Sequence, residues 1–127
     1  MNEYVLDASA LLVLLQNEPG AELVQNCLPT SVISSVNFSE TVSRLTRYGM
    51  PDAEIRDMLE LLGLEIVPFY TDQAYESGFL SASTKSSGLS FGDRACLALA
   101  QQLNRTALTS DKAWKSLDLG IQIEMIR

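Results

Sequence analysis

Short apolar runs alternate with longer stretches of helical periodicity along the whole chain. The apolar runs predict five strands, at Tyr4–Leu6, Ser31–Ser34, Glu65–Pro68, Thr106–Thr109 and Ile121–Met125. The stretches between them predict helices, at Ser9–Gln16, Ala21–Cys27, Val36–Tyr48, Asp52–Leu62, Asp72–Ser86, Phe91–Leu103 and Asp111–Ser116. Because strands that are separated by helices indicate βαβ units, we expect a short, mostly parallel sheet with helices on both faces.

Two of the predicted helices differ in how they present apolar residues. Phe91–Leu103 is apolar nearly all round, which is typical of a helix buried against a sheet, and only Asp93 and Arg94 in its first turn are charged. Asp52–Leu62 has a single apolar stripe opposite its acidic residues. That pattern indicates a surface helix or one side of a dimer contact.

Two hydroxyl residues mark expected helix starts. Thr71 and Ser90 each precede a helical stretch and are plausible N-caps. Between these helices the segment Thr84–Gly88 (TKSSG) is the one loop whose composition favours mobility.

Length and composition predict one globular domain that spans residues 1–127. Apolar residues make up 46% of the chain and charged residues 20%, which is ordinary for a folded domain. The longest apolar run, Ala10–Leu15, is too short to span a bilayer and no basic segment precedes it, so we expect neither a membrane anchor nor a signal peptide. Cys27 and Cys96 have apolar neighbours, and we expect them to be buried and reduced in a cytoplasmic protein.

Charge and the lack of histidine limit the chemistry. The sequence has no histidine, which excludes histidine acid–base catalysis, Ser-His triads and histidine-ligated zinc. Oxygen ligands remain in number, and these suit Mg²⁺ or Mn²⁺. The formal net charge of −7 argues against a broad basic face for nucleic acid, but it is compatible with a small acidic centre that meets phosphate through a cation.

Four acidic residues fall where a predicted strand is followed by a helix, or in the first turns of a helix. Asp7 ends the first strand, and Glu40 lies early in the helix after the second. Asp93 lies in the first turn of the buried helix, and Asp111 follows the fourth strand. Ligands of an open α/β sheet bind beyond the carboxyl ends of its strands, so three of these acids point to one edge of the sheet. Asp93 could join them there.

Each of these acids also has a purely structural interpretation. Asp7 could cap the helix that follows it, and Asp111 is a plausible N-cap as well. Asp93 and the serine three residues before it have the spacing of a capping box. Glu40 precedes Arg44 by four residues, which is the favourable order for an exposed ion pair on a helix. Taken singly, none of the four acids requires a function.

Taken together, the four acids predict a cation site. Two carboxylates about 5 Å apart repel by roughly 3 kcal/mol at an effective dielectric constant of about 20. Four such groups make six pairs, and the sum of roughly 20 kcal/mol exceeds the stability of a typical domain before screening or protonation relieves it. A bound divalent cation, or an inserted arginine, would relieve this repulsion directly.

The segments that carry these acids resemble the motifs of the PIN-domain ribonucleases, and most closely those of the VapC toxins of toxin–antitoxin pairs. The segment YVLDASALLVLL is similar to the opening strand with its first acid, and SSVNFSETVSRL to the second motif. The segment LSFGDRACLALA resembles the third motif and is the most distinctive, and LTSDKAW resembles the fourth, with Thr109 two places before Asp111. The resemblance covers essentially the whole chain.

The resemblance implies a three-layer α/β/α sandwich with a short, mostly parallel sheet. It also implies a Mg²⁺- or Mn²⁺-dependent endoribonuclease that is the toxin of a toxin–antitoxin pair. Its partners would be an RNA substrate, a second copy in a homodimer, and a cognate VapB-like antitoxin whose tail lies over the active site. The catalytic and metal-binding residues implied are Asp7, Glu40, Asp93 and Asp111.

A metal-activated water is the nucleophile that this set of residues favours, since histidine is missing and no other nucleophile is evident. We expect Asp7 and Asp93 to hold the principal metal directly, and the other two acids to complete the site through waters or a second ion. Ser9 and Thr109 either orient the carboxylates by hydrogen bonds or serve in packing and capping.

Several further residues near the motifs have two possible roles. Five basic residues could contact RNA phosphates or be ordinary solvated charges: Arg44, Arg47, Lys85, Arg94 and Lys112. The best candidate for a phosphate contact is Arg94, because it adjoins Asp93. Tyr75 and Phe79 are four residues apart on a predicted helix, which favours a core or dimer surface over base stacking.

Two rival functions stay open. One is a phosphoryl-transfer domain with an acidic pocket, but receivers need paired acids after the first strand and a later lysine. Dehalogenase-like phosphatases need a D-x-D motif there, and the residue two places after Asp7 is Ser9, so neither pattern is met. The other is a non-catalytic binding module whose acids receive an arginine from a partner.

Overall fold

Five parallel strands form the sheet at the centre of the molecule. The computed structural model describes residues 3–127, so residues 1 and 2 of the predicted domain lie outside the described part. The sheet has the order β3-β2-β1-β4-β5, and all four strand pairs within the described residues are parallel. Its strands are β1 (Tyr4–Leu6), β2 (Ser31–Ser34), β3 (Glu65–Val67), β4 (Thr106–Thr109) and β5 (Ile123–Met125).

The predicted strands are confirmed, with two shortened ends. β3 stops before Pro68, because proline has no N–H to donate to the neighbouring strand. β5 begins at Ile123 rather than Ile121. The register places Val5 of the central strand opposite Val32 on one side and Ala107 on the other.

Helices account for most of the remaining chain. They are α1 (Ala8–Leu15), α2 (Ala21–Cys27), α3 (Ser35–Arg47), α4 (Asp52–Leu61), α5 (Thr71–Phe79), α6 (Ser81–Thr84) and α7 (Phe91–Leu103). Short 3₁₀ helices lie at Leu28–Thr30, Lys85–Ser87 and Lys112–Ser116. The last of these occupies the stretch for which an α-helix was predicted, and Asp111 is its N-cap.

The continuous helix predicted at Asp72–Ser86 is wrong, because the chain breaks at Leu80 into α5, α6 and a 3₁₀ turn. The hydroxyls of Ser83 and Thr84 both donate to the carbonyl oxygen of Leu80, at 3.2 and 2.8 Å. Serine and threonine often compete with the helix in this way. Thr71 is also not the N-cap of α5 but its first residue, and Tyr70 precedes it as the cap.

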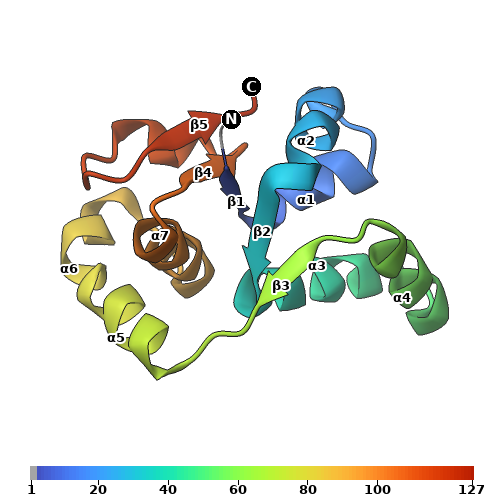
Figure 1. Cartoon of the computed structure of the whole chain (residues 1–127), viewed down its shortest axis with the longest axis horizontal. Coiled ribbons are helices and arrows are strands. Elements are labelled where there is room, and N and C mark those ends of the chain that lie inside the picture. Colours follow the sequence, from blue (N-terminus) through green and yellow to red (C-terminus); the bar gives the residue numbers. More distant parts are fainter. Residues whose placement is uncertain (1–2) are drawn as a thin grey trace.

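Side chains of successive strand residues alternate between two cores. Leu6, Ile33 and Leu108 pack on one face against α1 to α4. Val5, Val32 and Ala107 pack on the other face against α7. Figure 1 shows α7 on one side of the sheet, with α5 and α6 outside it, and α1 to α4 on the other side. The expected three-layer α/β/α sandwich is therefore confirmed.

The predicted burial of Phe91–Leu103 is also confirmed. Seven residues of α7 are buried, since the helix lies between the sheet, α3 and α5. Cys96 on this helix and Cys27 at the end of α2 are free and buried, as expected. Within residues 3–127, no helix has the length and apolar character needed to cross a membrane.

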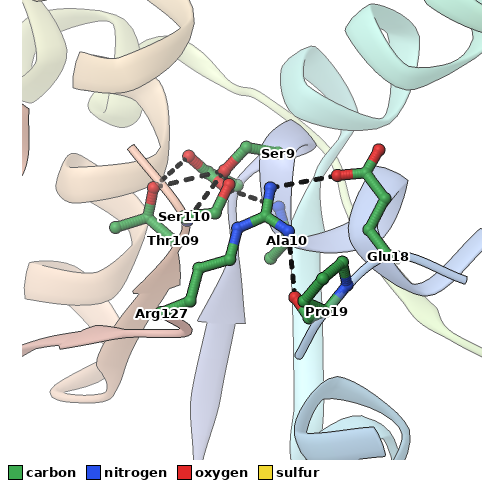
Figure 2. Close-up of polar contacts among 8 residues, drawn as sticks. Ser9, Ala10, Glu18, Pro19, Thr109, Ser110 and Arg127 are labelled. Atoms are coloured by element: carbon green, nitrogen blue, oxygen red, sulfur yellow. Dashed lines mark hydrogen bonds and ion pairs between the residues drawn. The ribbon is translucent and has the colours of Figure 1, made fainter. Parts of the chain in front are cut away.

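The C-terminus is fixed to the loop between α1 and α2. Arg127 donates to the carbonyl oxygen of Pro19 and forms an ion pair with Glu18, both at 3.0 Å (Figure 2). Ile126 fills the space beside Gly20, where a Cβ atom would overlap with its Cγ2. The last two residues thus bind a segment made early in synthesis.

Strand order determines where a ligand can bind. β1 is in the middle, and the chain places β2 and β3 on one side of it but β4 and β5 on the other. A crevice forms at such a switch point, beyond the carboxyl ends of the strands. Asp7 follows β1 and Asp111 follows β4, so both acids lie at this edge.

Candidate active site

All four acids predicted to form the site line a single pocket at the carboxyl edge of the sheet. The pocket has a volume of about 310 Å³. Its walls come from β1–α1, α3, the start of α7 and the segment after β4, which are far apart in sequence. The lining residues are Asp7, Ala8, Ser9, Leu12, Asn37, Glu40, Arg44, Ser90, Asp93 and Asp111.

Asp7 is the most buried of the acids, with only 4% of its surface exposed. It follows β1 and is the N-cap of α1, where its Oδ1 accepts from the backbone N–H of Ala10 at 2.9 Å. Burial raises the pKa of Asp7 to about 6, and hydrogen bonds from Thr109, Ser9 and Ala10 offset part of that effect. The side chain therefore caps a helix and also faces the pocket.

Two hydroxyl groups hold the Asp7 carboxylate from opposite sides. Ser9 Oγ donates to Oδ1 and Thr109 Oγ1 donates to Oδ2, each at 2.7 Å. The backbone N–H of Ser110 donates to Ser9 Oγ, and that of Asp111 donates to Thr109 Oγ1, both at 3.0 Å. Figure 2 shows Ser9, Thr109 and Ser110 meeting at this point. The network connects the first acid of the pocket to the fourth, so the hydroxyls orient the carboxylate as well as pack.

Asn37 and Gly92 position Glu40, and sequence analysis missed the role of both. Asn37 Nδ2 donates to Glu40 Oε1 at 3.0 Å and to the carbonyl oxygen of Gly92 at 2.9 Å. A Cβ atom on Gly92 would overlap with the Glu40 carboxylate, so glycine is needed for this close approach. The contacts attach α3 to the first turn of α7. A signal was present in the sequence, since Asn37 precedes Glu40 by three residues, a spacing at which side chains on a helix are neighbours. In the structure Asn37 is 1% exposed.

The structural interpretations of Asp93 and Asp111 also hold. Asp93 forms a capping box with Ser90, in which its Oδ2 accepts from the Ser90 N–H at 2.9 Å. Asp111 Oδ1 accepts from the N–H of Ala113 at 3.0 Å and caps the 3₁₀ helix. In each case the hydrogen bond uses one carboxylate oxygen. Capping therefore fixes these side chains at the pocket wall.

Electrostatic interactions connect three of the acids, Asp7, Glu40 and Asp93. Asp93 raises the pKa of both Asp7 and Glu40, in addition to the larger effect of burial on each. Asn37 and Arg44 act in the opposite direction on the pKa of Glu40. Below them, burial raises the pKa of the Cys96 thiol well above its usual value, and the same three acids add to this. Asp93 is therefore the member that links Asp7 and Glu40.

The acids line one pocket, but their side chains do not converge on one point. Among residues 3–127, no three acidic or cysteine side chains are grouped closely enough to share a metal ion. Mutual repulsion of roughly 3 kcal/mol per pair at about 5 Å favours such a spread. The donor set still fits a hard divalent cation in kind, because all four candidate ligands are carboxylates around one small pocket.

The basic residues are placed differently from expectation. Arg94, the best candidate by sequence, does not line the pocket; its Nε donates to the carbonyl of Ser77 at 3.2 Å and its Nη1 to that of Leu89 at 3.4 Å. Arg44 is the one basic side chain among the described residues that line it. Arg47 and Lys112 are exposed and outside the pocket wall.

Two apolar features lie away from the acids. A larger cavity of about 620 Å³ between α3 and α4 has mainly apolar walls, among them Phe38, Ile55 and Leu64. Its lining includes none of the four acids, so it is not the chemical centre. Tyr75 and Phe79 on α5 contact each other and are 64% and 70% exposed, so the core alternative is wrong and the dimer surface stays a prediction.

Comparison with known proteins gives a consistent result. The family model described as "PIN domain" matches residues 4–119. The chain is 27% identical over 125 positions to a "Ribonuclease VapC" of Mycolicibacterium smegmatis, and the match covers 91% of this chain and 97% of the relative.

Solved structures share the fold. A toxin–antitoxin complex from Klebsiella pneumoniae contains a chain that is 20% identical, with a TM-score of 0.75 and coverage of 98% of both chains. DNA-bound VapBC from Salmonella typhimurium contains another that is 20% identical, with a TM-score of 0.70 and coverage of 100% of both chains. The family model spans nearly the whole chain and includes all four acidic segments, which confirms the resemblance found in the sequence. The chain belongs to the PIN domain family.

Proposed function

We propose that this protein is an endoribonuclease that requires Mg²⁺ or Mn²⁺, and that it is the toxin of a toxin–antitoxin pair. The observation that carries the proposal is the pocket at the switch point of the sheet, which is lined by acids from four distant segments. Its family membership and its similarity to a ribonuclease VapC support this choice over other acidic sites. We also infer that the chain acts as one domain, since strands from both ends share one sheet.

The cation would be held by carboxylates of this chain. We assign the principal ligands to Asp7 and Asp93, and supporting positions to Glu40 and Asp111. A divalent cation at such a site lowers the pKa of a water molecule and stabilises charge on phosphate oxygens. The ligand oxygens still open to it are the ones that capping does not use, such as Asp93 Oδ1 and Asp111 Oδ2.

The other residues of the pocket keep the ligands in position. Ser9 and Thr109 hold both oxygens of Asp7, so its carboxylate cannot rotate freely. Asn37 fixes Glu40 against the start of α7. Rigid support of this kind lowers the reorganisation needed when a ligand binds. It also explains why a carboxylate as buried as Asp7 is tolerated beside other acids.

The test is a cleavage assay with and without divalent cation. Purified protein, structured RNA and Mn²⁺ or Mg²⁺ are combined, and Asp7→Asn and Asp93→Asn variants are prepared in the same way. We expect cation-dependent cleavage by the wild type and a loss of at least about a hundredfold in each variant. If wild type and variants leave comparable traces of cleavage, contamination explains the activity and the enzyme proposal fails.

A second measurement separates an enzyme site from a plain acidic surface. Because only the folded state assembles the ligands, Mn²⁺ at millimolar concentration should raise the melting temperature of the wild type but not of Asp7→Asn. An equal shift in both proteins contradicts a cation site at Asp7. A missing shift together with tight capture of an arginine-rich peptide supports the rival binding module.

We further propose a cognate antitoxin as a cytoplasmic protein partner, and a homodimer as the form of the free toxin. The basis is that several solved structures of the same fold are toxin–antitoxin complexes, some of them bound to DNA. Co-expression with the product of a small neighbouring gene tests the partner, which should co-purify and block cleavage. Light scattering of the purified chain tests the dimer.

A further inference from the structure

The acidic pocket presents an electrostatic problem to a nucleic acid. Four of its lining residues are carboxylates, while every phosphate of an approaching RNA strand is also negative. We infer that Arg44 binds a phosphate of the RNA backbone next to the bond that is cut. This inference rests on the proposed function and adds to it a residue that positions the substrate.

Arg44 occupies a suitable place for this contact. It lies one turn after Glu40 on α3, and its exposed side chain forms part of the pocket wall with the four acids. The guanidinium attracts Glu40 but forms no ion pair within 4.0 Å, since the pairs among the described residues are Arg105–Glu3 and Arg127–Glu18. Its charge therefore lies at the pocket wall and is not neutralised by an ion pair among the described residues.

The chemistry of Arg44 suits a phosphate. Its guanidinium carries five N–H groups in a planar fork, a geometry that can donate two hydrogen bonds to the oxygens of one phosphate.

Other cations near the site are not placed to replace Arg44. Arg94 donates to two backbone carbonyls that hold α5 and the loop before α7. Arg47, on the same helix as Arg44, is exposed but does not line the pocket. Arg47 therefore offers a matched control, because its removal changes the net charge equally and leaves the pocket wall intact.

The experiment measures RNA binding in a background that cannot cleave. The probe is a fluorescein-labelled, single-stranded RNA of mixed sequence, titrated by anisotropy with Asp93→Asn protein over a series of salt concentrations. Arg44→Gln in this background should weaken binding about fivefold or more and reduce the slope of log K against log salt by about 0.7, as expected for one lost phosphate contact. Arg47→Gln should change neither quantity. Arg44→Lys should keep the slope while binding more weakly, because the fork geometry is lost.

The result separates the contact from a merely structural role. If Arg44 only balanced the charge of Glu40, Arg44→Gln and Arg47→Gln would give the same affinity and slope, and the inference would be overturned.

The two proposals can fail separately. If the wild type cleaves RNA while Arg44→Gln and Arg47→Gln bind alike, the phosphate contact is refuted and the ribonuclease proposal stands. If the wild type never cleaves but the Arg44→Gln slope falls, the ribonuclease proposal is refuted, and what stands is an RNA phosphate contact by Arg44 with no cleaved bond beside it.

Discussion

In the absence of metal, the free energy of unfolding of the Asp7→Asn variant, relative to that of the wild type, should be higher at pH 8 than at pH 5. The carboxyl is buried, and its pKa is raised from the ordinary value of 3.8 to about 6. Between these two values the unfolded chain binds fewer protons at this group than the folded protein does. The stability of the wild type therefore falls as pH rises through this interval. Asparagine does not ionise and removes that loss.

The magnitude follows from the two pKa values. A carboxyl with a pKa of about 6 in the folded state and 3.8 in the unfolded state costs the folded protein about 3 kcal/mol once it is fully ionised. Roughly half of that loss has occurred by pH 5, so about 1.4 kcal/mol remains between pH 5 and pH 8. The free energy of unfolding of Asp7→Asn minus that of wild type should rise by this amount over the interval. Fixed costs of the amide, such as a mismatched hydrogen bond to Thr109, cancel in the comparison.

Urea denaturation in EDTA at both pH values measures this difference. Trp114 is the sole tryptophan of the sequence and is 1% exposed, so its fluorescence reports global unfolding. Asp57→Asn, at an exposed position of α4, is the control and should show no pH-dependent gain. An Asp7→Asn stability difference that is the same at pH 5 and pH 8 would refute the assignment of a raised pKa to Asp7.

Three further substitutions test the support of the acids. Gly92→Ala should displace the Glu40 carboxylate and reduce cleavage at least about tenfold. Gly78→Ala is the control and should keep activity, because no atom of another segment lies within 4 Å of the new Cβ, and equal rates for the two variants would contradict the close approach of Gly92 and Glu40. Thr109→Val should raise the pKa of Asp7 by about one to two units because a hydrogen bond to its carboxylate is lost, while Thr109→Ser should not. NMR titration of the Asp7 carboxyl carbon in the metal-free protein measures the pKa, and identical midpoints for the two variants would disprove the effect of the hydrogen bond. Asn37→Ala should lower the free energy of unfolding by about 1–3 kcal/mol, since it removes two hydrogen bonds of a buried side chain, one to the Gly92 carbonyl and one to the Glu40 carboxylate. The exposed Asn26→Ala should change it little, and similar urea midpoints for both variants would argue against the α3–α7 contact.

Local patterns were sufficient to predict the layers of the fold. The α7 segment and the central strands are buried between helices and sheet, and segments buried on all sides need apolar residues at nearly every position. Such runs can be recognised directly in the sequence. The acids at Asp7 and Asp111 could be placed at one edge because parallel strands share the direction of their carboxyl ends. Strand order itself was not needed for that step.

Features that depend on contacts across the chain could not be predicted in the same way. Capping does not remove Asp93 from the pocket, because one carboxylate oxygen caps the helix and the residue still lines the pocket wall, so the site role stays a prediction. Arg94 was favoured for its place beside Asp93, yet a helix turns neighbouring side chains in different directions, and α5 takes its guanidinium. The break at Leu80 depends on hydroxyl–carbonyl bonds that helical periodicity does not reveal.

The position of β1 at the centre of the sheet has a consequence for the timing of protein synthesis. β1 is made first, but its partner β4 begins only at Thr106, and Asp111 comes later still. A chain that stops before Asp111 therefore lacks one wall of the pocket. If the protein cleaves RNA, a nascent chain gains that activity only after β4 and the segment that carries Asp111 have left the ribosome and β4 has paired with β1.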